Sequence, residues 1–82
     1  MTAKEFKKII EQEVNPVAVT QNDNGDVYVI DSEKLTVLAW ICGHEADHFI
    51  SYYGLDNSDS WKALIAFAET PPAERGLPWK TD

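Results

Sequence analysis

The fold of this chain is decided by the stretch VAVTQNDNGDVYVI, residues 17–30. Two runs rich in β-branched residues, 17–20 and 27–30, flank a polar segment that contains Asn24 and Gly25. An Asn-Gly pair adopts the positive φ values that a tight turn between antiparallel strands needs. The stretch therefore predicts a β-hairpin whose turn centres on Asn24-Gly25.

Helical periodicity lies on both sides of this hairpin. Upstream, apolar residues recur every three or four positions from Thr2 to Val14, and Thr2 with Glu5 has the spacing of a capping box. Asn15-Pro16 ends this first predicted helix, because the residue before proline avoids the α region. Downstream, the N-cap residue types at 56–60 start a second helix, which Thr70-Pro71-Pro72 ends. We predict that its buried stripe consists of Trp61, Leu64, Ile65 and Ala68.

The middle of the chain contains a third strand and an ambiguous segment. Residues 35–42 form a nearly continuous apolar run that Gly43 ends, and we interpret it as a strand. Residues 44–53 fit both a helix and an edge strand, so that choice stays open. The predicted fold class is α+β: an N-terminal helix, a three-stranded antiparallel β-meander and a C-terminal helix packed on the sheet. This single domain covers 1–72, and 73–82 form an extended C-terminal tail in which Leu77 and Trp79 dock.

The chain has the composition of a small folded domain. Its 82 residues include 44% hydrophobic residues, with three each of Trp, Tyr and Phe, which is enough for one modest core. No apolar run has the length of a membrane span, and the lone Cys42 cannot form an internal disulfide. We therefore expect a cytoplasmic protein that does not bind a membrane.

Charge is concentrated in one part of the chain. Seven Lys and Arg face 14 Asp and Glu, giving a net charge of −7. The excess lies between residues 23 and 59, where a single Lys, Lys34, and no Arg accompany eight acids: Asp23, Asp26, Asp31, Glu33, Glu45, Asp47, Asp56 and Asp59. Phosphates would be repelled, so we expect no nucleic acid and instead a partner with a basic surface. The alternative is that these acids only keep the chain soluble.

Residues 44–48, His-Glu-Ala-Asp-His, have the form H-E-x-x-H. On a helix this spacing brings both imidazoles to one face, where they can share a zinc ion. The pattern resembles the zincin metallopeptidase motif, and the resemblance implies metal ligands at His44 and His48 and a general base at Glu45. The competing interpretation is a solvated turn or helix start whose acids complement the helix N-terminus.

The hairpin region resembles another known family. The order of helix, hairpin, further strand and closing helix loosely resembles the SUKH immunity domains. These domains also place a Gly-Asp pair, an aromatic residue and an Asp around a hairpin, here Gly25, Asp26, Tyr28 and Asp31. The resemblance is confined to this short stretch, so we assign no family from it.

The large aromatic residues carry the leading functional hypothesis, because Tyr and Trp anchor many protein interfaces. We predict a small acidic protein-binding module without enzymatic activity, an adaptor or inhibitor that acts through an aromatic surface with an acidic rim. Its predicted partner-binding residues are Trp40, Tyr52, Tyr53, Asp56 and Asp59, and a homodimer is also compatible with this surface. No cofactor is expected. The alternative function is a zinc-binding protein or minimal metallopeptidase that uses His44 and His48.

Overall fold

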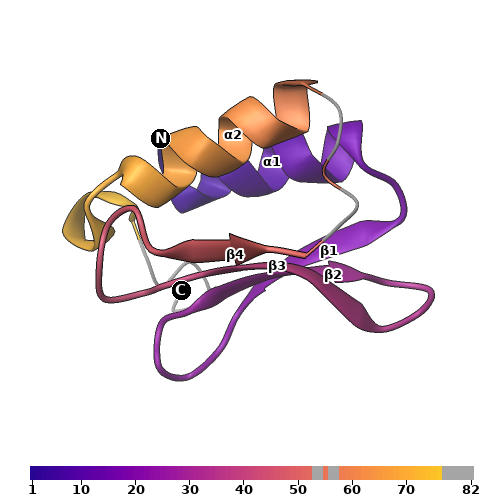
Figure 1. Ribbon diagram of the computed structural model, residues 1–82, viewed down its shortest axis with the longest axis horizontal. Coiled ribbons are helices and arrows are strands. Elements are labelled where there is room, and N and C mark those ends of the chain that lie inside the picture. The colour runs from indigo at the N-terminus through magenta and orange to yellow at the C-terminus, as the bar shows by residue number, and fades with distance from the viewer. Residues whose placement is uncertain (53–54, 56–57, 77–82) are drawn as a thin grey trace.

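A computed structural model describes residues 1–52, 55 and 58–76 (Figure 1). Over these residues the fold is α+β, with two α-helices and a four-stranded antiparallel sheet of order β1-β2-β3-β4. The elements are α1 (Ala3–Glu13), β1 (Val17–Gln21), β2 (Val27–Asp31), β3 (Thr36–Ile41), β4 (Phe49–Ser51), α2 (Ser58–Glu69) and the 3₁₀ turn η1 (Pro72–Glu74).

The predicted hairpin is present, but its turn lies one residue earlier than Asn24-Gly25: Asp23 and Asn24 are the central residues, and Asn24 does not have a positive φ. β1 and β2 pair antiparallel from Val17 opposite Asp31 to Gln21 opposite Val27. Gly25 in the connecting turn has a φ of 94°, and its amide donates to the Asn22 carbonyl oxygen at 3.1 Å. The positive φ explains why glycine is suited to this position.

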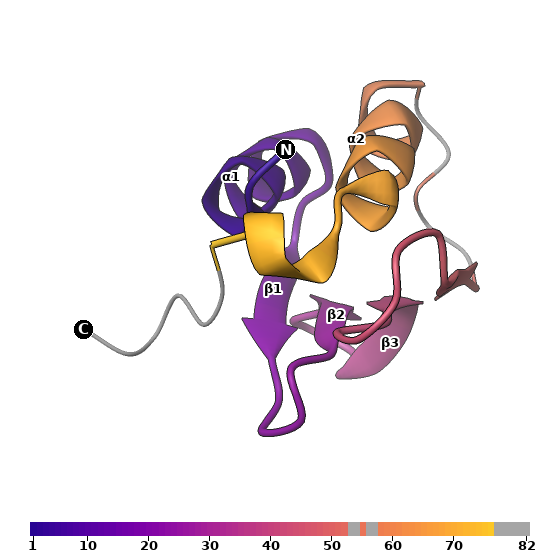
Figure 2. The same ribbon diagram turned by 90° about the vertical axis from the view of Figure 1, so that its left-hand side faces the viewer.

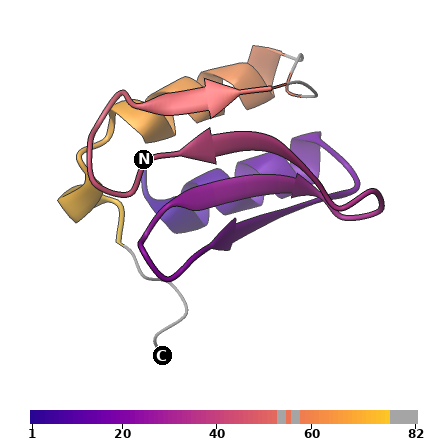
Figure 3. The same ribbon diagram turned by 60° about the horizontal axis from the view of Figure 1, so that its bottom comes forward.

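The prediction of three strands is wrong, because the sheet has a fourth strand, β4. β4 belongs to the segment for which helix and strand were both open, and it pairs with β3 from Ala39 opposite Ser51 to Ile41 opposite Phe49 (Figure 3). The chain reverses through residues 43–48, where Asp47 has a φ of 60°, a left-handed conformation that Asp tolerates better than most residues. Hydrogen bonding to β3 therefore selects the edge strand over the helix.

Both helices lie on the same face of the sheet (Figures 1 and 2). α1 begins with the predicted capping box, in which the Thr2 hydroxyl accepts from the Glu5 amide and the Glu5 carboxylate accepts from the Thr2 amide. α1 meets α2 through Phe6 and Phe67, whose rings stack with centroids 4.4 Å apart. The layer between helices and sheet is the core, into which Val27, Val29 and Ile41 point from the strands.

α2 buries a face that is rotated from the predicted stripe but shares Leu64 and Ala68 with it. Ala63 and Phe67 are buried together with Leu64 and Ala68, whereas Trp61 is 44% exposed. Hydrophobicity alone does not fix the rotation of the helix about its axis, which the stacking of Phe67 on Phe6 of α1 sets. The large Trp61 ring lies beside Phe49 instead, at a centroid distance of 6.4 Å.

The segment expected to begin the extended tail is folded at its start. Pro72–Glu74 forms η1, and the Arg75 side chain is fully buried. The Arg75 carbonyl oxygen also accepts from the Ala3 amide at 2.7 Å, which ties this segment to the start of α1. Residues 77–82, including Leu77 and Trp79, lie outside the described residues. In the described part of the chain, neither α-helix has the length and apolar character needed to cross a membrane.

Candidate functional site: the outer sheet face

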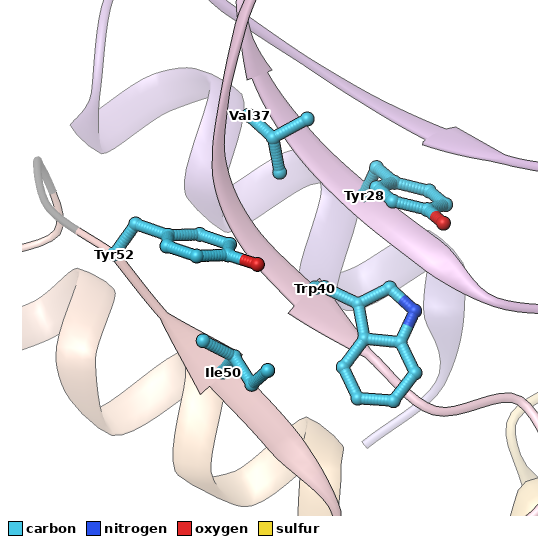
Figure 4. A pocket seen from close by; sticks show the side chains of 5 residues that line it. All are labelled: Tyr28, Val37, Trp40, Ile50 and Tyr52. Carbon is cyan, nitrogen blue, oxygen red and sulfur yellow. The ribbon is translucent and has the colours of Figure 1, made fainter.

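The face of the sheet opposite the helices carries an open aromatic hollow (Figure 4). This hollow has a volume of about 450 Å³. We call it the outer hollow. It is lined by Tyr28, Val37, Trp40, Ile50 and Tyr52. None of the described helices covers this face of the sheet (Figure 2).

Strand pairing explains why these side chains meet. Tyr28 in β2 lies opposite Trp40 in β3, and Trp40 lies opposite Ile50 in β4, so the three form one row across the sheet. The neighbours of Tyr28 along β2, Val27 and Val29, point into the core. This alternation follows from the two-residue repeat of a strand.

A β-bulge adds Val37 to the same face. Val37 and Trp40 are three residues apart, so regular alternation would put them on opposite faces. In β2, Val29 pairs with Ala39 and the next residue, Ile30, pairs with Val37. Leu38 lies between these two partners in β3 and is therefore the extra residue of the bulge. Leu38 and Ala39 are consequently both buried, and Val37 returns to the outer face.

The Asp26 carboxylate fixes one wall of the outer hollow. Its Oδ2 accepts from the Trp40 indole Nε1 at 2.9 Å, and its Oδ1 accepts from the Gly43 amide at 2.7 Å. Asp26 is itself buried, with 8% exposed. The carboxylate therefore joins the β1–β2 turn to the end of β3 and holds the indole in one orientation.

Two exposed side chains, His48 and Glu45, continue this contact network: His48 lies next to Trp40, and Glu45 lies next to His48. The His48 imidazole meets the Trp40 indole edge to face, with centroids 5.1 Å apart. Glu45 Oε2 lies 3.7 Å from His48 Nδ1. Two carboxylates are thus linked to Trp40, one by a direct hydrogen bond and one through an imidazole.

The structure brings together only part of the predicted binding surface. Trp40 and Tyr52 both line the outer hollow, as a single binding surface requires. Asp59 lies elsewhere, in a groove between α1 and α2 that it shares with Ile9 and Lys62. Tyr53 and Asp56 lie outside the described residues.

The H-E-x-x-H segment does not have the helical geometry of the zincin pattern. His44 and His48 are exposed in the loop between β3 and β4. Across the described ranges, no group of three or more His, Cys, Asp and Glu side chains could hold a metal ion. The described donors therefore do not fit a zincin site, because the zincin pattern depends on a helix to bring the i and i+4 imidazoles to one face.

Sequence reasoning missed three lining residues, Tyr28, Val37 and Ile50. The alternation of Val27, Tyr28 and Val29 was a usable signal for Tyr28. Ile50 follows once residues 49–51 are paired as a strand. Val37 depends on the bulge, and no local pattern in the sequence indicates it.

Comparison of the chain with protein-family models, with curated proteins and with solved structures gives no match.

Proposed function

We propose that this chain is a non-enzymatic protein-binding module whose outer sheet face contacts a partner protein. The observation that carries the proposal is the outer hollow, where three of the five lining residues are exposed: Val37 at 37%, Ile50 at 46% and Tyr52 at 57%. Contiguous exposed apolar surface with aromatic anchors is typical of protein interfaces. An adaptor or an inhibitor would act in this way.

The charge of the chain supports a basic partner. The net charge is −7. Of the acids, Asp26 accepts a hydrogen bond from Trp40, and Glu45 lies beside the His48 imidazole that contacts Trp40. Opposite charge on the partner would accelerate association, and phosphate backbones would be repelled. We accordingly propose a protein partner with a basic surface rather than nucleic acid, met in the cytoplasm.

The test compares a variant with substitutions on the outer face and a control variant with a substitution on the exposed side of α1. Ile50→Ser/Tyr52→Ser changes two exposed side chains of the outer face, and Gln12→Ser changes an exposed side chain of α1. Proteins recovered by the wild-type chain from cell extract are purified, and their dissociation constants are measured by titration calorimetry. We expect the outer-face variant to bind at least about tenfold more weakly, because anchor truncations cost about 2 kcal/mol.

Gln12→Ser should bind like the wild type. Circular dichroism and thermal unfolding check that both variants remain folded. A partner that binds Ile50→Ser/Tyr52→Ser as tightly as the wild type would overturn the proposal, since the outer face would then make no contact.

A further inference from the structure

The outer hollow combines aromatic rings with nearby negative charge. Tyr28, Trp40 and Tyr52 contribute three rings to one hollow, and none of its five lining side chains carries a charge. The faces of aromatic rings attract cations, and tryptophan does so most strongly. The hollow therefore has the chemistry of a receptor for a positively charged side chain.

The contacts of Trp40 strengthen this character. Its indole N–H donates to the Asp26 carboxylate at 2.9 Å, and a carboxylate acceptor increases the electron density of the ring. The same hydrogen bond fixes the ring, so less conformational freedom is lost when a ligand stacks on it. Glu45 adds a second negative charge close by, 3.7 Å from the imidazole that contacts the indole.

We infer that the outer hollow binds an arginine side chain presented by the partner protein. This inference rests on the proposed function and names the feature of the partner that the face recognises. Guanidinium is planar and weakly hydrated, so it stacks on aromatic rings more readily than the compact, strongly hydrated ammonium of lysine. Charge complementarity supports this occupant, because a chain with net charge −7 attracts arginine-rich segments.

The first experiment uses short peptides of Gly and Ser that carry two arginines, two lysines or two citrullines. Citrulline has nearly the shape of arginine but no charge. The readout is the indole N–H resonance of Trp40 in a ¹⁵N-labelled wild-type chain, assigned with a Trp40→Phe variant. We expect the arginine peptide to shift this resonance and to bind at least about threefold more tightly than either analogue.

Two pairs of variants locate the effect. Tyr52→Leu removes one ring of the outer hollow, and Trp61→Leu removes an exposed ring of α2. Glu45→Gln removes a charge near Trp40, and Asp59→Asn removes a charge in the groove between the helices. We expect Tyr52→Leu and Glu45→Gln each to weaken arginine-peptide binding by about threefold, and their controls to leave it within error.

Three results would overturn the inference. One is binding of the citrulline or lysine peptide as tight as that of the arginine peptide, and another is the absence of any shift of the Trp40 resonance. The third is a wild-type dimer, seen by analytical ultracentrifugation, that Tyr52→Leu dissociates, because a second copy would then occupy the hollow. If one of the first two results is obtained while the partner protein still loses affinity for Ile50→Ser/Tyr52→Ser, the arginine inference fails and the proposed function survives.

Discussion

The Arg75 guanidinium donates through Nη1 to the Cys42 carbonyl oxygen at 2.6 Å, across 33 positions of sequence. It also donates to the carbonyl oxygens of Ala68 and Thr70, and it lies 4.9 Å from the centroid of the Phe67 ring. Burial lowers the pKa of Arg75 from its ordinary value, although an arginine keeps its proton at neutral pH. One side chain thus connects the end of α2 to the residue that follows β3.

Arg75→Ala should lower the free energy of unfolding by about 3 kcal/mol, because buried carbonyl oxygens lose their donor and packing is lost against Phe67. Urea unfolding followed by circular dichroism measures the change. Arg75→Lys should recover only part of the loss, since an ammonium cannot reproduce the planar fork of donors. Wild-type stability in Arg75→Ala would contradict this role.

Gly43→Ala should be strongly destabilising. A Cβ at Gly43 would overlap the carbonyl group of Gly25 and lie 2.8 Å from the Asp26 amide nitrogen, so backbone would have to move. We expect a loss of about 2 kcal/mol or more. Gly76→Ala is the control, because a Cβ there meets nothing within 4 Å and only the φ of 75° is unfavourable. Its cost should be about 1 kcal/mol.

Asp26→Ala should loosen the wall of the outer hollow, because the Trp40 indole and the Gly43 amide both lose their acceptor. We expect a loss of about 2 kcal/mol in stability and faster exchange of the Trp40 indole hydrogen, measured by NMR. Asp26→Asn keeps one acceptor oxygen and should give intermediate values. Exchange as slow in Asp26→Ala as in the wild type would show that Asp26 does not hold the ring.

The folded state should lose stability at acidic pH as three carboxylates become protonated. Hydrogen bonds within the Thr2 capping box lower the pKa of Glu5, and the Lys34 and Glu33 amides lower the pKa of Asp31. Burial raises the pKa of Glu11, but hydrogen bonds from Lys7 and the Val19 amide outweigh it, so this pKa is lowered too.

A carboxylate whose pKa is lower in the folded state stabilises the fold above its unfolded pKa. That contribution disappears as the pH falls through the lower, folded value. The thermal midpoint should therefore be level above about pH 5 and fall below about pH 4. Glu11→Gln should make this fall shallower, and a midpoint that rises on acidification would contradict the assignment.

The untagged chain should bind well below one equivalent of zinc. Its H-E-x-x-H residues lie in a loop, and the described part of the chain offers no cluster of three ligands. Native mass spectrometry measures the metal content after purification in zinc-containing buffer. One full equivalent of zinc that disappears in His48→Ala would instead support the alternative of a zinc-binding protein.

Local sequence determined the elements that are specified by short-range chemistry. The Thr2 capping box and the apolar periodicity after it were sufficient for α1, because both act within a few residues. The two β-branched runs and Gly25 were sufficient for the hairpin, since a positive φ at glycine is a property of the residue itself. The net charge of −7 also followed from composition.

Tertiary structure decided the elements that depend on distant partners. Residues 49–51 fit helix and strand equally well, and only their pairing with β3 made them β4. The outer hollow depends on the bulge that places Val37 beside Trp40, and the buried Arg75 depends on a carbonyl oxygen 33 positions away. Each of these features depends on a partner outside the segment itself, so the residues of that segment do not determine it.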